Sequence, residues 1–194
     1  MMNFSQLIAI ILSAILVENL VFVKFLGVSP FWGPGKRLET AISLGLSVTV
    51  VMTVSSIANF VVGALLRSVG FEVLNLAAFV LIAATVTQLL DYVLQRTSPT
   101  MHAAQGVYLP LVAVNTAVLG AVMISNMDGM TFFGTVGYSF LAGLGFLIAV
   151  TLFASVRERL DFSEIPNAFE GIPIALITAG LISMAFMGFA GMRI

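Results

Sequence analysis

The spacing of apolar residues constrains this chain more than any other feature. Windows of about 20 mostly apolar residues, the length that crosses a hydrocarbon core of roughly 30 Å as a helix, alternate with short segments rich in Gly, Pro and charge. A helix satisfies its own backbone hydrogen bonds, which hydrocarbon cannot do. The sequence therefore predicts an all-α integral membrane protein with six transmembrane helices, near residues 4–27, 40–66, 73–94, 105–126, 131–154 and 172–191.

Composition agrees with this class. Of the 194 residues, 60% are hydrophobic and 9% are charged, whereas a soluble domain has about 25% charged residues. The longest polar stretch, 157–171, is too short to bury a core of its own, so we expect a single transmembrane domain over 1–194. The net charge is -1 without a basic run, so nothing predicts a nucleic-acid partner. The first window lacks a basic start and a cleavage site, and we read it as a retained helix.

Two of the apolar windows contain helix-breaking sequence at corresponding places. The first breaks at Gly27-Val28-Ser29-Pro30, and the fourth between Pro110 and Gly120, around Asn115-Thr116. A break at membrane depth persists only where protein or a cavity covers the freed backbone groups. Paired breaks in the two halves of a membrane protein mark its functional centre.

An internal repeat with a displacement of 98 residues accompanies the breaks. Gly45-Leu46 and Thr53 align with Gly143-Leu144 and Thr151. Each half, about 1–98 and 99–194, then holds three helices, and an odd number of crossings inverts the second half. We predict two inverted three-helix repeats with broken helices 1 and 4.

The distribution of Lys and Arg predicts the orientation. Loops after helices 1, 3 and 5 carry most of these residues, and the other side has only Arg67 and Arg193. Basic loops stay in the cytoplasm, so both termini are predicted to be extracytoplasmic. The basic residues on the cytoplasmic side are Lys24, Lys36, Arg37, Arg96, Arg157 and Arg159.

Few polar side chains lie inside the predicted helices. Glu18 and Asn19 lie deep in the first, where an ionisable residue is a functional candidate, and with Asn115 they form a possible ion path. Alternatively, Glu18 pairs with Lys24, which reaches the headgroups. No His/Asp/Glu cluster has metal-ligand spacing and no phosphate-binding loop follows a strand, so no catalytic or metal residue is predicted.

The remaining charged residues lie at helix ends. We expect an interfacial cluster at Asp91 and Arg96, and an exposed loop side chain at His102. The run 157–159 is interpreted as a solvated helix end, with a docking surface for a soluble partner as the alternative.

Several runs are unlike generic transmembrane sequence, and together they cover essentially the whole chain. They resemble the A subunit of the Rnf-type ion-translocating ferredoxin:NAD oxidoreductase complex and, more distantly, the E subunit of the sodium-translocating NADH:quinone reductase. The runs are 23–31 (VKFLGVSPF), 36–41 (KRLETA), 108–111 (YLPL), 115–120 (NTAVLG), 157–160 (RERL), 175–181 (ALITAGL) and 185–189 (AFMGF).

This resemblance implies a site and partners. The family subunit pairs with a homologous six-helix membrane subunit, and the two hold a [2Fe-2S] cluster between their broken helices, with two cysteines from each. Flavin- and iron-sulfur-bearing subunits complete the complex in a bacterial or archaeal cytoplasmic membrane. The family's two cysteine positions are Ser29 and Thr116 here, and the chain has no cysteine at all.

Hydroxyls are poor substitutes for the thiolates that hold iron-sulfur clusters. Three interpretations follow: a natural paralogue that lost or relocated the cluster, an engineered cysteine-free sequence, or a cluster held by the partner with weak help from this chain. We favour a chain that keeps the fold and partner surfaces while its own cluster ligation is impaired.

The resemblance implies a membrane subunit of a redox-driven ion-translocating oxidoreductase, which passes electrons through a shared site and is not catalytic alone. A small secondary ion transporter and a structural membrane subunit remain alternatives. Co-purification with redox partners separates the first from the other two. Sodium and protons both remain possible as the transported ion.

Overall fold

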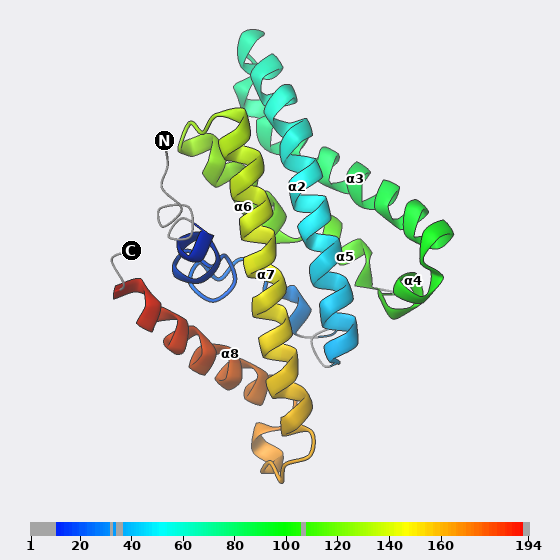
Figure 1. Ribbon diagram of the computed structural model, residues 1–194, viewed down its shortest axis with the longest axis vertical. Coiled ribbons are helices and arrows are strands. Elements are labelled where there is room, and N and C mark those ends of the chain that lie inside the picture. The colour runs from blue at the N-terminus through cyan, green and yellow to red at the C-terminus, as the bar shows by residue number, and fades with distance from the viewer. Residues whose placement is uncertain (1–10, 32, 34–36, 106–107, 192–194) are drawn as a thin grey trace.

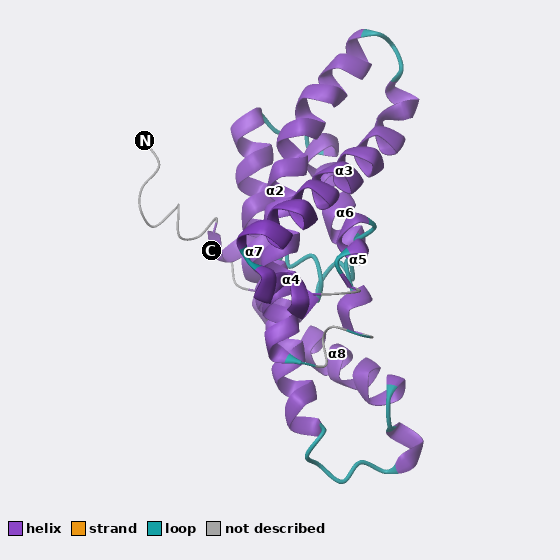
Figure 2. Ribbon diagram, turned by 90° about the vertical axis from the view of Figure 1, so that its right-hand side faces the viewer, coloured by secondary structure: helices purple, strands orange, loops and turns teal. Residues whose placement is uncertain are grey.

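The computed structural model describes residues 11–31, 33, 37–105 and 108–191, and the regular structure within them is helical (Figure 1, Figure 2). The predictions that concern residues 4–10, Lys36 and Arg193 lie outside the described residues. Four helical spans are long and apolar enough to cross a membrane, and they coincide with the second to fifth predicted windows. They are Leu38–Ser68, Glu72–Thr97, Pro110–Met127 and Phe132–Leu160.

Shorter helices make up the remaining elements. The last predicted window holds α8 (Ile172–Met187), which at 16 residues is shorter than the other spans, followed by η7 (Gly188–Gly191). The elements, in chain order, are η1 (Ser13–Val17), η2 (Ser29–Phe31), α2 (Leu38–Ser68), η4 (Glu72–Leu74), α3 (Asn75–Thr97), α4 (Pro99–Gln105), α5 (Pro110–Ala113), α6 (Thr116–Met127), α7 (Phe132–Leu160), η6 (Asn167–Phe169), α8 and η7.

The first helix ends earlier in the structure than the sequence predicted. Its described part ends with a π-helical turn, in which Glu18 N donates to Ser13 O at 2.8 Å, and not at residue 27. Residues 18–28 form turns and irregular backbone. The physical reason is the amide of Asn19, which bonds nearby backbone groups and so competes with the helix.

The long helices α2 and α7 pack side by side in opposite directions at the centre of the molecule (Figure 1). Gly45 of α2 lies against Leu147, where an added Cβ would come 2.6 Å from Leu147 Cδ1. Gly143 of α7 lies against Thr49, where an added Cβ would come 2.9 Å from Thr49 Cα. Small residues thus allow the two backbones to approach closely, as is usual between membrane helices.

The buried core surrounds this pair and the irregular segment after η1. Phe31 stacks on Phe153 of α7 with ring centroids 3.9 Å apart, and Phe22 contacts Phe186 of α8 at 4.9 Å. In the apolar 18-residue window of the span Glu72–Thr97, which comprises η4 and α3, only 17% is buried, so this span offers an apolar face to its surroundings. The α2–α3 and α7–α8 connections lie at opposite ends of the long axis (Figure 2).

Candidate functional site

The first break is built around the side chain of Asn19, which is fully buried. Its amide nitrogen donates to the carbonyls of Ile15 and Gly145, and its oxygen accepts from the backbone N–H groups of Val21 and Phe22. These four bonds use the full capacity of the amide. Asn19 therefore satisfies backbone groups that the break frees and joins them to α7.

A left-handed backbone follows this turn. Phe25 has φ 55° and Gly27 has φ 74°, a region that a bulky residue such as Phe rarely adopts. Leu26 N donates to Leu20 O at 2.7 Å. The chain thereby folds back on itself and presents the backbone of Gly27 to the second half of the protein.

The second break lies between α5 and α6, where the sequence predicts it. Asn115 has extended backbone dihedrals and caps α6, its side-chain oxygen accepting from Ala117 N at 2.9 Å. Asn, Asp and Ser are the preferred residues at such a position. Both breaks thus use an Asn side chain that accepts from the N–H two residues further on.

The two breaks are in direct contact. Gly27 N donates to the hydroxyl of Thr116 at 2.7 Å. An added Cβ on Gly27 would lie 2.7 Å from both Asn115 Oδ1 and Ala117 Cβ, and one on Gly120 would lie 2.5 Å from Leu26 Cδ1. The irregular segment after η1 therefore packs on the first turn of α6 without space for another side chain.

Ser29 and Thr116 lie in these contacting segments. Ser29 is half-buried at the start of η2, and Thr116 is exposed at the start of α6. The Thr116 hydroxyl bonds a backbone amide, whereas a cluster needs thiolate sulfur. No cysteine is present, and within the described residues no group of three or more His, Asp or Glu could hold a metal. The donor set therefore does not fit a [2Fe-2S] cluster.

Glu18 lies at the start of the first break. Its carboxylate is 3.0 Å from Lys24 Nζ, and about half of the Glu18 side chain is exposed. The structure thus contains the Glu18–Lys24 pair that the sequence offered as one of two interpretations. An ion path along Glu18, Asn19 and Asn115 stays a prediction.

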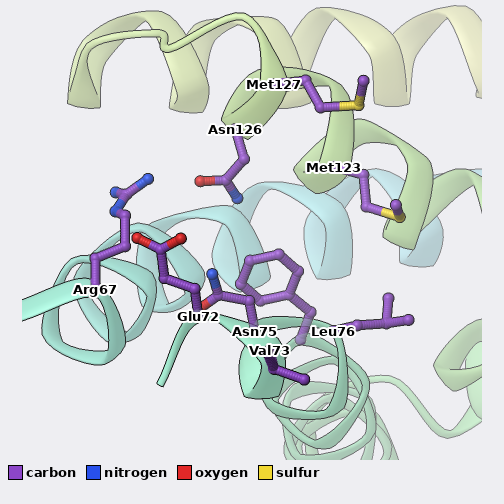
Figure 3. A pocket seen from close by; sticks show the side chains of 9 residues that line it. Arg67, Glu72, Val73, Asn75, Leu76, Met123, Asn126 and Met127 are labelled. Atoms are coloured by element: carbon purple, nitrogen blue, oxygen red, sulfur yellow. The ribbon is translucent and has the colours of Figure 1, made fainter. Parts of the chain in front are cut away.

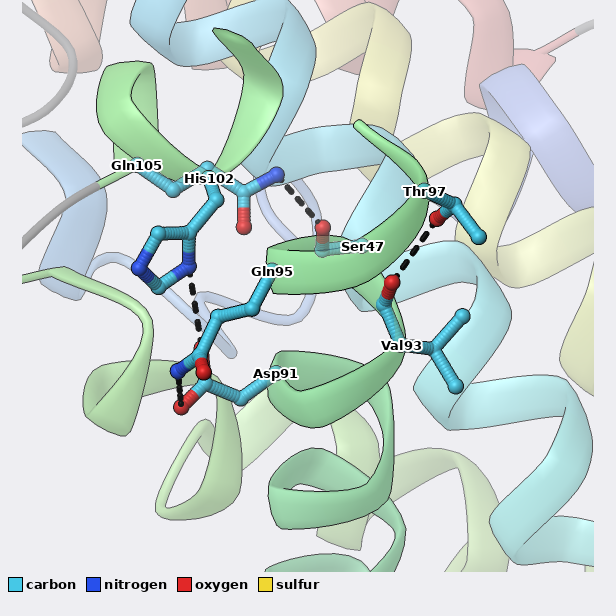
Figure 4. Close-up of polar contacts among 7 residues, drawn as sticks. All are labelled: Ser47, Asp91, Val93, Gln95, Thr97, His102 and Gln105. Atoms are coloured by element: carbon cyan, nitrogen blue, oxygen red, sulfur yellow. Dashed lines mark hydrogen bonds and ion pairs between the residues drawn. The ribbon is translucent and has the colours of Figure 1, made fainter. Parts of the chain in front are cut away.

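The prediction of an exposed loop histidine was wrong. His102 belongs to α4, is half-buried, and its Nδ1 lies 3.1 Å from Asp91 Oδ1 (Figure 4). The two atoms lie close together without hydrogen-bond geometry. Gln95 donates to the other Asp91 oxygen at 3.3 Å, and Arg96 lies over the Tyr92 ring instead.

The interpretation of 157–159 as a solvated helix end holds for only part of the run. Glu158 and Arg159 are exposed, but Arg157 is 6% exposed and donates to Gly171 O at 3.2 Å. The loop between α7 and α8 folds back over the helix end, which buries this guanidinium.

Gln105 makes a buried contact that the sequence did not predict. Its amide nitrogen donates to Ser43 O at 2.9 Å and to the Ser47 hydroxyl at 2.7 Å (Figure 4). It thereby joins α4 to α2. Its position at the edge of an apolar window was the available signal, because a polar side chain there needs a partner.

Comparison with known proteins shows the family of this chain. The family model described as "Rnf-Nqr subunit, membrane protein" matches residues 7–193. The A subunit of the Na(+)-translocating ferredoxin:NAD(+) oxidoreductase complex of Acetobacterium woodii is 45% identical over 97% of this chain and 98% of the relative. The A subunit of the ion-translocating oxidoreductase complex of Vibrio cholerae serotype O1 is 42% identical with the same coverage. The chain therefore belongs to the Rnf-Nqr family of membrane protein subunits.

Proposed function

We propose that this chain is a membrane subunit of a redox-driven ion-translocating oxidoreductase and that it contributes the broken-helix half of a site shared with a homologous subunit. Relatives covering nearly the whole chain carry the name of the A subunit of such complexes. The contact between Gly27 and the start of α6 carries the structural part of the proposal. It brings the two irregular backbones together, as a centre built from broken helices requires.

Reciprocal contacts between α2 and α7 support an inverted repeat as the basis of this site. Gly45 contacts Leu147, and Thr49 contacts Gly143. The two contacts are related by the displacement of 98 residues: Gly45 corresponds to Gly143, and Thr49 corresponds to Leu147. A two-fold relation produces this exchange of partners, and Phe60 against Phe132 continues the antiparallel alignment.

In this chain the shared site operates without iron ligands of its own. The Thr116 hydroxyl fixes Gly27 N, and a protonated hydroxyl is a hard oxygen donor that suits iron-sulfur sites poorly. The chain then retains the shape of the half-site and its partner surface. Any cluster in the complex depends on ligands from another subunit.

Restoring the thiolates tests this proposal. The complex that contains this chain is purified with Ser29→Cys, with Thr116→Cys and with both replacements, and iron, acid-labile sulfide and the electron paramagnetic resonance signal after reduction are measured. The double variant should gain or strengthen a [2Fe-2S] signal, and each single variant should gain much less. A Ser68→Cys/Thr97→Cys pair, at exposed positions near helix ends, controls for adventitious iron binding.

Two results would contradict the proposal. One is a full cluster signal in the unmodified complex that the double replacement leaves unchanged, because ligation then does not involve these positions. The other is equal iron uptake by the control pair, because the gain then reflects added thiols alone.

A further inference from the structure

A cavity of about 350 Å³ lies where α2 ends, α3 begins and α6 ends (Figure 3). It lies away from the two breaks, at the far end of α6. Its rim is polar and its wall is apolar, which is the pattern of a site for an amphipathic molecule. Asn75 lines it, and the amide oxygen of Asn75 is buried without a hydrogen-bond partner.

Two opposite charges lie on the rim without pairing. Arg67 comes from the last turn of α2 and Glu72 from η4, and their side chains extend toward the same side of the cavity (Figure 3). The ion pairs within the described part of the chain join other residues, so Arg67 and Glu72 form no ion pair with each other. A ligand that carries both signs of charge would satisfy both.

An amide on α6 adds an acceptor. Asn126 donates its side-chain N–H to Val122 O at 3.2 Å, which leaves its oxygen free, and Figure 3 shows this oxygen on the side that faces Arg67. Since Glu72 also offers oxygen acceptors, the rim has one strong donor and several acceptors.

The wall is suited to an acyl chain. Phe79, Leu76 and Met123 line the cavity, and Leu76, on a helix long and apolar enough to cross a membrane, is 52% exposed. Met127 and Val73, at the edge, are 81% and 94% exposed. Such apolar exposure is stable next to hydrocarbon, so a lipid fits this place better than a water-soluble ligand.

We propose that this cavity binds a zwitterionic phospholipid with a primary ammonium in its headgroup, of the phosphatidylethanolamine class. The phosphate accepts from the Arg67 guanidinium, whose planar donors suit phosphate oxygens. The ammonium has three N–H donors, and the Glu72 carboxylate and the Asn126 side-chain oxygen accept hydrogen bonds from them. A choline headgroup lacks these donors, and an anionic glycerol headgroup leaves Glu72 without a cation.

The test measures lipid retention by the intact complex that contains this chain. The purified complex is exchanged into nanodiscs with equal amounts of phosphatidylethanolamine, phosphatidylcholine and phosphatidylglycerol, and retained lipids are counted by native mass spectrometry. The ethanolamine lipid should exceed each of the others by roughly fivefold, the effect of one partly exposed charged contact.

Variants separate the two charges. Glu72→Gln should reduce the excess of ethanolamine lipid over choline lipid, because only uncharged oxygen acceptors then remain for the ammonium, and Arg67→Gln should lower the retention of all three lipids. Arg96→Gln and Glu164→Gln remove matched charges outside the cavity and should change neither ratio. Size-exclusion chromatography checks that every variant assembles.

Two outcomes would overturn the proposal. One is retention without headgroup preference, or a preference that both cavity variants leave unchanged. The other is loss of a partner subunit from the Arg67→Gln and Glu72→Gln complexes with no change in lipid, which would make the cavity a protein interface.

Discussion

Gly27 combines two separate requirements for glycine. Its φ of 74° lies in the left-handed region, and its α-carbon faces Asn115, Ala117 and Phe146 with no space for a methyl group. A side chain here would strain the backbone and separate the two breaks.

Gly70 offers a matched comparison, because its φ is 80° and an added Cβ would meet nothing within 4 Å. Gly27→Ala should reduce the redox activity of the complex by about tenfold or more, since a displacement of about 1 Å at a functional site is costly. Gly70→Ala should change activity less than about twofold and lower stability by about 1 kcal/mol. Equal loss in both variants would show that backbone strain, not the contact between the breaks, is responsible.

Asn115 combines a capping role with a place in the predicted ion path. If capping dominates, Asn115→Ser should keep most of the stability of the complex, because the Ser hydroxyl also accepts from the first backbone N–H groups of α6 and adds no charge at this buried position, whereas Asn115→Ala should lower the free energy of unfolding by about 1 kcal/mol. Denaturant titration of the purified complex measures both. If both variants have the original stability, the side chain does not stabilise the start of α6.

At the scale of elements, continuous apolar spans were predictable from the sequence and breaks were less so. The spans of α2, α3 and α7 follow the predicted windows within a few residues, except that α7 continues to Leu160. The second break was predicted because Pro110 and Asn115 mark it. The predicted end of the first helix was wrong, because the prediction relied on the helix breakers Gly27 and Pro30. The helix is instead disrupted at Asn19, whose side chain makes four hydrogen bonds to local and distant backbone groups that no sequence pattern reveals.

The candidate site was also predictable only in part from the sequence. The contact of the segments that hold Ser29 and Thr116 followed from paired breaks, but the burial of Arg157 and the contact of His102 with Asp91 depend on how loops fold back. Such contacts join residues whose relative position is set by tertiary packing, so spacing along the chain does not encode them.

The pairing of α2 with α7 makes a prediction about helix packing. Gly143→Leu should destabilise the protein by roughly 1–3 kcal/mol, because the new side chain meets the backbone of Thr49 and overpacks the contact. Gly137→Leu is the control on the same helix, since an added Cβ there meets nothing within 4 Å. Its stability should be unchanged or higher. Melting curves of both variants in the same detergent check the difference.

At the scale of the whole molecule, the family of this chain predicts an assembly. Relatives that match nearly the whole chain are named as subunits of ion-translocating complexes. An affinity-tagged chain should therefore co-purify with a homologous membrane subunit and with flavin- and iron-sulfur-bearing subunits. A stable monomer that transports ions by itself after reconstitution would contradict this prediction and favour a secondary transporter.

Orientation is the remaining property of the whole molecule that charge predicts. The α2–α3 and α7–α8 connections lie at opposite ends (Figure 2), and the second of these follows Arg157 and Arg159. Because basic segments stay in the cytoplasm, a single cysteine at Ser163 should react with a membrane-impermeant maleimide only after the cells are opened. Cysteines near Asn3, at Gly70 and near Met192 should react in intact cells. The cysteine-free sequence makes each label unambiguous, and reaction of the Asn3 and Met192 positions only from the cytoplasmic side would reverse the orientation.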